Sequence, residues 1–176
     1  MLELNINPVE LLDNSDPEVS RIITLDGGTF RFEHSLQTLA KWEAIYKVPF
    51  LTTAEKTHNQ WMGYYLCMCL DEGLSVYHIT PEVREKLDKY IADSQTATKI
   101  QNGNKTSGKK PPIQTAETIY ALLTILNIPY ECDRWHLNRL FTLMEVVSIK
   151  SSPPKKMSRN EIYKRNKELN NKRRAR

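Results

Sequence analysis

The chain has 176 residues, of which 40% are apolar and 26% are charged, as is typical of a soluble globular protein that buries a sizeable core in one domain. No apolar run is long enough to cross a bilayer, and the first residues lack the basic start and apolar stretch of a signal peptide. Cys67, Cys69 and Cys132 do not have the spacing of a disulfide framework. These features exclude the membrane-spanning and disulfide-rich secreted classes and predict a soluble protein of a reducing cytosol.

Charge is distributed unevenly along the chain. There are 25 Lys or Arg against 21 Asp or Glu, a net charge of +4. Ten of the basic residues but only two of the acidic ones lie in residues 155–176, which gives this segment a net charge of +8 and leaves −4 on residues 1–154. We therefore expect a single globular domain, residues 1–150, followed by a linker and a basic tail in residues 151–176.

The N-terminal residues predict a short antiparallel sheet. Apolar and polar residues alternate over residues 2–6, which is the period of a half-buried strand, and Pro8 ends it. Residues 13–20 are rich in turn formers and predict a loop.

Residues 21–25 and 29–33 are β-prone runs on either side of an Asp-Gly-Gly sequence, which predicts a hairpin. Phe30 and Phe32 would then point to the same face, toward the helices. A phosphate-binding loop at these glycines is the alternative. It lacks a lysine and a strand-to-helix context, so the hairpin is favoured.

Five helices are predicted to follow, because apolar residues recur at helical spacing after each of five capping residues. These caps are Ser35, Thr52 (with Glu55 in a capping box), Thr80, Thr115 and Asp133. Pro49, Gly73 and the Asn127-Ile128-Pro129 sequence are expected to end the first, second and fourth helices. Residues 99–114 are polar, basic and rich in Gly and Pro, which predicts a mobile loop.

The pattern predicts an α+β, mostly helical fold. A short N-terminal antiparallel sheet would pack on a bundle of about five helices, with Trp42 and Trp135 as buried anchors. In the tail, Ser158-Arg159-Asn160-Glu161 reads as a capping box that starts a basic C-terminal helix.

No arrangement of residues predicts catalysis, a metal site or a cofactor site. The histidines are scattered, and Cys67 and Cys69 would diverge on a helix, so a core role is favoured over a metal pair. His136 has no acid–nucleophile pair beside it, and a histidine bonded at a helix end is the simpler interpretation. Asp71-Glu72 predicts solvated carboxylates at the end of a helix. We therefore expect a non-enzymatic protein.

An interaction protein fits these features best. The alternative is a nucleic-acid-binding accessory protein acting through the tail, whose basic residues can neutralise phosphates. Against it, the body is acidic and the aromatic residues fall on predicted core faces rather than among basic residues. In either case the candidate partner-binding residues are basic residues of the tail: Lys155, Lys156, Arg159, Lys164, Arg165, Lys172, Arg173, Arg174 and Arg176.

Four runs of residues carry a resemblance to a known family. They are Phe32-Glu33-His34-Ser35-Leu36 with Leu39, Trp42-Glu43 and Pro49-Phe50-Leu51; Asp93-Ser94-Gln95-Thr96-Ala97-Thr98; Asn127-Ile128-Pro129-Tyr130-Glu131-Cys132 followed by Trp135-His136-Leu137-Asn138-Arg139; and Pro153-Pro154-Lys155-Lys156-Met157-Ser158. In these runs the chain resembles small proteins of tailed bacteriophages that act as tail assembly chaperones and are made alongside the tape-measure protein.

The resemblance implies a non-enzymatic protein of the host cytoplasm without a cofactor. Such a protein keeps the long tape-measure protein soluble while tail-tube subunits assemble, and it is absent from the finished virion. The partners implied are the tape-measure protein and the tail-tube protein. The family offers no defined binding residues to carry over, and the sequence leaves the oligomeric state open.

Overall fold

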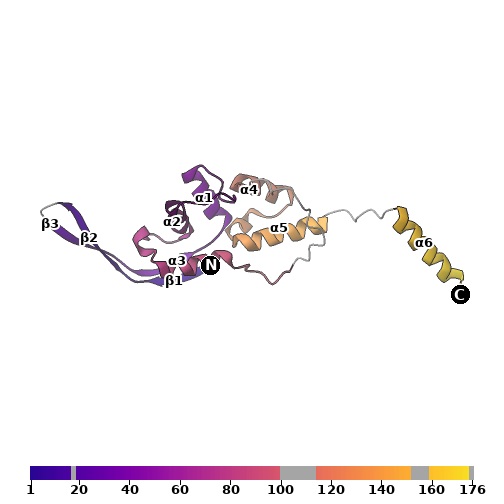
Figure 1. Cartoon of the computed structure of the whole chain (residues 1–176), viewed down its shortest axis with the longest axis horizontal. Helices are drawn as coiled ribbons and strands as arrows, with labels where there is room; N and C mark the ends of the chain where they lie inside the picture. Colours follow the sequence, from indigo (N-terminus) through magenta and orange to yellow (C-terminus); the bar gives the residue numbers. More distant parts are fainter. Residues whose placement is uncertain (17–18, 100–113, 152–158, 175–176) are drawn as a thin grey trace.

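The fold is α+β, as the sequence predicts, in a computed structural model that describes residues 1–16, 19–99, 114–151 and 159–174. Figure 1 shows an N-terminal β-ribbon that extends from a helical body, and a final helix that lies apart from this body. The predicted antiparallel strands at the N-terminus and the predominance of helices after them are confirmed.

The N-terminal residues form two successive two-stranded antiparallel ribbons. Strand β1 (Leu2–Ile6) pairs with β4 (Gly28–Phe32), and β2 (Val9–Asp16) pairs with β3 (Val19–Leu25). In Figure 1 the β2–β3 ribbon projects to the left, away from the helices, whereas β1 runs beside α3 (Pro81–Ala92).

The hairpin predicted between residues 21–25 and 29–33 is wrong, and so is the loop predicted over residues 13–20 where that range is described, at residues 13–16 and 19–20; residues 17–18 lie outside the described structure. Residues 21–25 pair with β2 instead, and Asp26-Gly27 connects two consecutive strands of one long ribbon. Turn-forming residue types at 13–16 are part of β2, because the pairing partner across the ribbon decides the conformation there.

Cross-strand packing explains why β4 pairs with β1. Leu2 lies opposite Phe32, and Leu4 lies opposite Phe30, so the pairing brings these apolar side chains to one face. Phe30 and Phe32 are buried in the core, which confirms the prediction that both face the helices.

Gly27 lies where the two ribbons join. The pairing of β1 with β4 ends at Ile6 and Gly28, and Pro8 has no N–H with which to continue the ladder. A Cβ on Gly27 would lie 2.4 Å from the carbonyl oxygen of Ile6 and 2.5 Å from the nitrogen of Pro8. The junction therefore requires glycine for close backbone approach, which is a different role from the turn that the sequence predicted.

The body contains five α-helices and two short 3₁₀ helices among the described residues. The α-helices are α1 (Leu36–Tyr46), α2 (His58–Met68), α3 (Pro81–Ala92), α4 (Ala116–Ile125) and α5 (Leu137–Ser151), and the 3₁₀ helices are η1 (Val76–His78) and η2 (Tyr130–Arg134). α1 is central, because it contacts α2, α4 and η2. Its Trp42 is fully buried against Phe50 and Tyr64, as predicted for an anchor of the core.

Three of the five predicted caps are confirmed. The side chains of Ser35, Thr80 and Thr115 each accept a hydrogen bond from a backbone N–H in the first turn of α1, α3 and α4. The break predicted after α4 is also confirmed, since that helix ends at Ile125.

The second helix is shorter than predicted, because it begins later and ends earlier. Thr57 caps α2 in a capping box with Gln60, so the predicted box at Thr52 and Glu55 is wrong. α2 ends at Met68, and Gly73, with a positive φ of 89°, lies in the loop that follows instead of closing the helix. The chain leaves the helix early because Cys69 pairs with Phe32 of β4.

The start of α5 also differs from the prediction. Asp133 lies in η2 and caps no helix, and α5 begins at Leu137. Trp135 therefore precedes the helix, with the Arg139 guanidinium 4.2 Å from its ring centroid. It packs against the core but is only half-buried, which is less than predicted for a buried anchor.

Several predictions fall on residues that are not described. These are most of the loop at residues 99–114, the linker after Ser151 and the cap at Ser158. Within the described ranges, every helix is too short or too polar to span a lipid bilayer.

Candidate partner-binding surfaces

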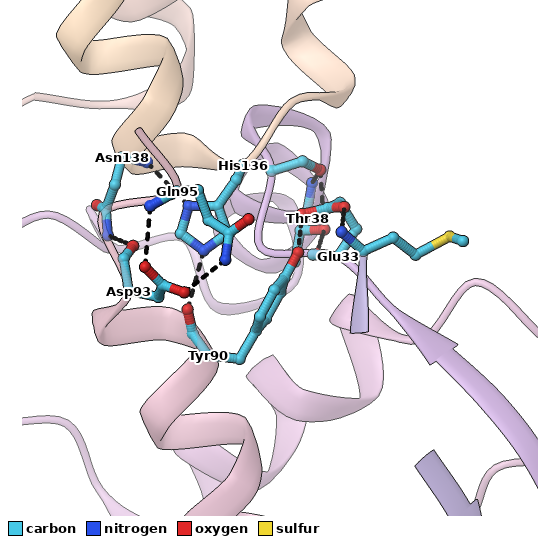
Figure 2. Close-up of polar contacts among 9 residues, drawn as sticks. Glu33, Thr38, Tyr90, Asp93, Gln95, His136 and Asn138 are labelled. Atoms are coloured by element: carbon cyan, nitrogen blue, oxygen red, sulfur yellow. Dashed lines mark hydrogen bonds and ion pairs between the residues drawn. The ribbon is translucent and has the colours of Figure 1, made fainter. Parts of the chain in front are cut away.

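A polar joint connects β4, α3 and α5 (Figure 2). The Tyr90 hydroxyl donates to Glu33 Oε1 at 2.6 Å, and His136 Nε2 donates to the Tyr90 carbonyl oxygen at 3.0 Å. Asn138 Nδ2 donates to the carbonyl oxygens of Ile91 and Asp93. These bonds attach the end of α3 to the beginning of α5 across a long separation in sequence.

His136 is the N-cap of α5. Its Nδ1 accepts the backbone N–H of Asn138 at 3.3 Å, which leaves Nε2 as the protonated nitrogen that donates to Tyr90. Burial lowers the pKa of His136. Both ring nitrogens are used in structural bonds, so the histidine is not placed as a general base.

A second buried histidine lies beside it. The His34 and His136 ring centroids are 5.0 Å apart, and His34 Nδ1 is 2.6 Å from the Tyr64 hydroxyl. Burial, and secondarily the charge of a protonated His136, lowers the pKa of His34 to about 3. Burial also raises the pKa of the Tyr64 hydroxyl. Both groups are therefore neutral near pH 7 and hold the core together through an uncharged hydrogen bond.

Other carboxylates act as structural links. Asp71 accepts hydrogen bonds from the backbone and guanidinium of Arg31, which lowers the pKa of Asp71. The sequence predicted solvated carboxylates at Asp71 and Glu72; Glu72 is exposed, and Asp71 lies at the surface in an ion pair with Arg31. Among the described residues, no cluster of three or more His, Cys, Asp or Glu side chains has the arrangement of a metal site.

Three of the four sequence runs that carry the family resemblance meet in this joint. Glu33 and His34, Asp93, and His136 and Asn138 come from three of the four runs and lie together in this joint, where Asp93 contacts Asn138 and His34 contacts His136. This placement gives the three runs a common structural role, which is to hold β4, α3 and α5 together.

The β2–β3 ribbon, which we call the arm, presents uncovered apolar side chains. Leu12 and Ile22 lie opposite each other in the ribbon and are 64% and 66% exposed. Glu10 and Thr24 form the next pair on the same face and are exposed too. We call this face, with Glu10, Leu12, Ile22 and Thr24, the outer face of the arm.

Helix α6 (Arg159–Arg174) presents basic and apolar side chains together. It carries seven basic and two acidic residues, a net charge of +5. Ile162 and Leu169, seven residues apart, share one side of the helix and are exposed. Tyr163 is 70% exposed among basic residues, which departs from the prediction that aromatic residues lie only on core faces.

The structure places six of the nine predicted partner-binding residues on α6. Arg159, Lys164, Arg165 and Arg173 are exposed there, and Lys172 and Arg174 belong to the same helix. Lys155, Lys156 and Arg176 lie outside the described residues. Because basic residues occur all around the helix, they do not gather on one face as a groove would require.

Sequence reasoning missed the arm as a candidate surface. The signal was the apolar pair of runs Leu11-Leu12 and Ile22-Ile23, which fit β-strands. The wrong hairpin assigned the second run to the core-facing sheet, so its exposure was not foreseen.

Comparison with protein-family models, with curated proteins and with solved structures gives no match for this chain. The likeness to phage tail assembly chaperones therefore rests on the sequence runs alone.

Proposed function

We propose that this protein is a non-enzymatic tail assembly chaperone of a tailed bacteriophage, which binds the tape-measure protein in the host cytoplasm and assists assembly of the tail tube. The observation that carries the proposal, besides the resemblance, is the exposure of apolar side chains on a well-packed body. Leu70, Val76 and Tyr77 are all exposed within residues 70–77, between α2 and α3.

A tape-measure protein is a long helical chain with apolar stripes, which needs an apolar surface to cover it before the tube does. Residues 70–77 lie beside the β-ribbon, because the Leu70 N–H donates to the carbonyl oxygen of Arg31 at 2.8 Å. The Arg31–Asp71 ion pair fixes the start of this segment. Its apolar side chains are thereby held in place on the surface, which suits a contact with the client.

Co-expression with the tape-measure protein of the same phage tests the proposal. We expect more soluble tape-measure protein with the wild-type chain than without it, and a clear loss with Val76→Ser/Tyr77→Ser. Ile125→Ser is the matched control, because it removes an exposed apolar side chain at the end of α4 instead. Equal amounts of soluble client with and without the chain would contradict the proposal.

The nucleic-acid alternative is favoured by one observation, the exposed Tyr163 next to Lys164 and Arg165 on α6. Such a tyrosine can stack on an unpaired base while basic residues bind phosphates. Capture of partners with and without nuclease separates the two functions. If the tape-measure protein is retained after nuclease treatment, the chaperone function is supported, and if all recovery disappears, nucleic acid is the partner.

A further inference from the structure

The arm is a two-stranded ribbon whose outer face has no cover in the described part of the chain. Leu12 and Ile22 lie opposite each other on this face and are exposed. A two-stranded hairpin is marginally stable in water unless its apolar face is packed against another element. The arm therefore has the properties of a surface that is covered by a partner.

Charge indicates which partner is suitable. Glu10 gives the outer face a negative charge, and the positive charge of Arg21 lies on the opposite face of the ribbon. A second arm would bring like charges together, which disfavours arm-to-arm packing. A basic element with its own apolar stripe would match both the charge and the exposed apolar pair.

Helix α6 of another copy has these properties. Ile162 and Leu169 form a short apolar stripe, and Arg165 and Arg173 each lie four residues from Leu169 along the same side. The lengths also agree, because the eight residues of β2 span about 26 Å and the 16 residues of α6 about 24 Å.

We propose that α6 of one copy packs on the outer face of the arm of a second copy. Ile162 and Leu169 cover Leu12 and Ile22, and a basic residue of α6 lies beside Glu10. This inference goes beyond the proposed function, because it holds whatever the client of the body is.

The contact is head-to-tail. Figure 1 shows the arm and α6 at opposite ends of the molecule, which favours another copy over the same chain as the source of the helix. Each copy then offers one arm and one α6, so the interface is heterologous and joins copies into chains or rings.

Complementation between two defective variants tests this arrangement. The arm variant is Leu12→Ser/Ile22→Ser and the α6 variant is Ile162→Ser/Leu169→Ser, both in the full chain. The control is Ile45→Ser/Ile125→Ser, which removes two exposed apolar side chains from the body. Sedimentation velocity over a concentration series at low ionic strength measures the mass of each.

We expect the wild type and the control to grow beyond a dimer with concentration, and each defective variant to stay monomeric. An equimolar mixture of the two defective variants regains one intact interface, so it forms a species of twice the monomer mass and nothing larger. Raising the ionic strength to about 0.5 M is expected to weaken the association about tenfold.

Other outcomes overturn the proposal. If the α6 variant still associates by itself, the arms pair with each other. If the wild type stays monomeric at every concentration, α6 does not dock on another copy.

Glu10→Arg provides a second test, which leaves the apolar residues unchanged. It is expected to weaken association about tenfold, and Arg165→Glu/Arg173→Glu in the partner copy is expected to restore it; failure of this restoration also contradicts the proposal.

Discussion

Gly27 is the residue on which the geometry of the β-ribbon depends most directly. We predict that Gly27→Ala destabilises the protein by about 2 kcal/mol, because the added Cβ would clash with backbone atoms of Ile6 and Pro8 that cannot move independently. Gly28→Ala is the matched control, since a Cβ there would meet only the edge of Phe30 at 4.0 Å. Urea unfolding of both variants measures the difference. Equal stability of the two would contradict this view of the junction.

His34 makes the stability of the protein depend on pH. Its pKa is about 3 in the folded chain, where burial disfavours the charged ring, against 6.5 for an exposed histidine. Between these values the unfolded chain binds more protons, so stability is fully present above pH 6.5 and falls as the pH falls toward 3. From pH 7 to pH 5, where most carboxylates stay ionised, His34 alone accounts for a loss of about 2 kcal/mol.

His34→Gln tests this dependence, because the amide keeps a hydrogen-bonding group near Tyr64 but takes up no proton. We expect the loss between pH 7 and pH 5 in urea unfolding to be smaller by about 2 kcal/mol in this variant. A remaining loss is expected from His136, whose pKa is lowered in the same direction. His58→Gln, at an exposed residue, is the control and should keep the wild-type dependence.

Individual caps were predictable where the interaction is local. Ser35, Thr80 and Thr115 each bind an N–H three residues ahead, so the sequence contains both partners within one turn. His136 caps α5 in a way the sequence did not reveal, because its orientation depends on the carbonyl oxygen of Tyr90, 46 residues away. Asp133 has the residue type of a cap, but Gln37 and Tyr120 bind its carboxylate instead.

Among the helices, Glu43 links α1 to two other elements. Its buried carboxylate accepts the N–H of Phe50 and the N–H of Ala116 at the start of α4, both at 2.8 Å. We predict that Glu43→Ala costs about 3 kcal/mol because both buried N–H groups lose their acceptor, and that Glu43→Gln costs about half as much because one oxygen remains. Thermal or urea unfolding checks the order of the two variants.

The control for this prediction is Glu55→Ala. Glu55 is exposed and does not take part in the cap of α2, which uses Thr57 and Gln60. We expect no measurable change in stability. A loss as large as that of Glu43→Ala would mean that the capping box expected at Thr52 forms after all.

Strand pairing was the part of the fold least accessible from the sequence. The existence of strands at residues 2–6 and 21–25 was predicted, because alternation and β-branched residues are local signals. Their partners were not, because an Asp-Gly-Gly sequence favours a hairpin in isolation and the preference is overridden by the packing of Leu2 and Leu4 against Phe32 and Phe30. The exposed arm was missed for the same reason, because it forms only when β3 pairs with β2.

At the scale of the whole molecule, the other elements of the body pack around α1, and the arm and α6 extend from the body at opposite ends (Figure 1). The basic tail was predicted from its charge, and its helix from the capping-box sequence at residues 158–161. The outer face of the arm was not predicted, because only the pairing of β2 with β3 brings Glu10 and Leu12 beside Ile22 on one exposed face.

Helix α6 has few interactions of its own to hold it in shape. Helices of about 15 residues or fewer are marginal in water, and most are stabilised by packing. Arg173, near the end of its 16 residues, suits the helix dipole. At an exposed residue this effect contributes only a few tenths of a kcal/mol.

We therefore predict that α6 is partly helical in dilute solution and becomes fully helical when copies associate. The measurement is the circular dichroism of the full chain minus that of a chain ending at Ser151, over a concentration series. The difference should correspond to fewer than the 16 residues of α6 when dilute and rise with concentration, and Ile162→Ser/Leu169→Ser should abolish the rise. A difference that corresponds to all 16 residues at every concentration would mean that α6 is a stable helix without a contact. That result would contradict the prediction that association with the arm completes the helix.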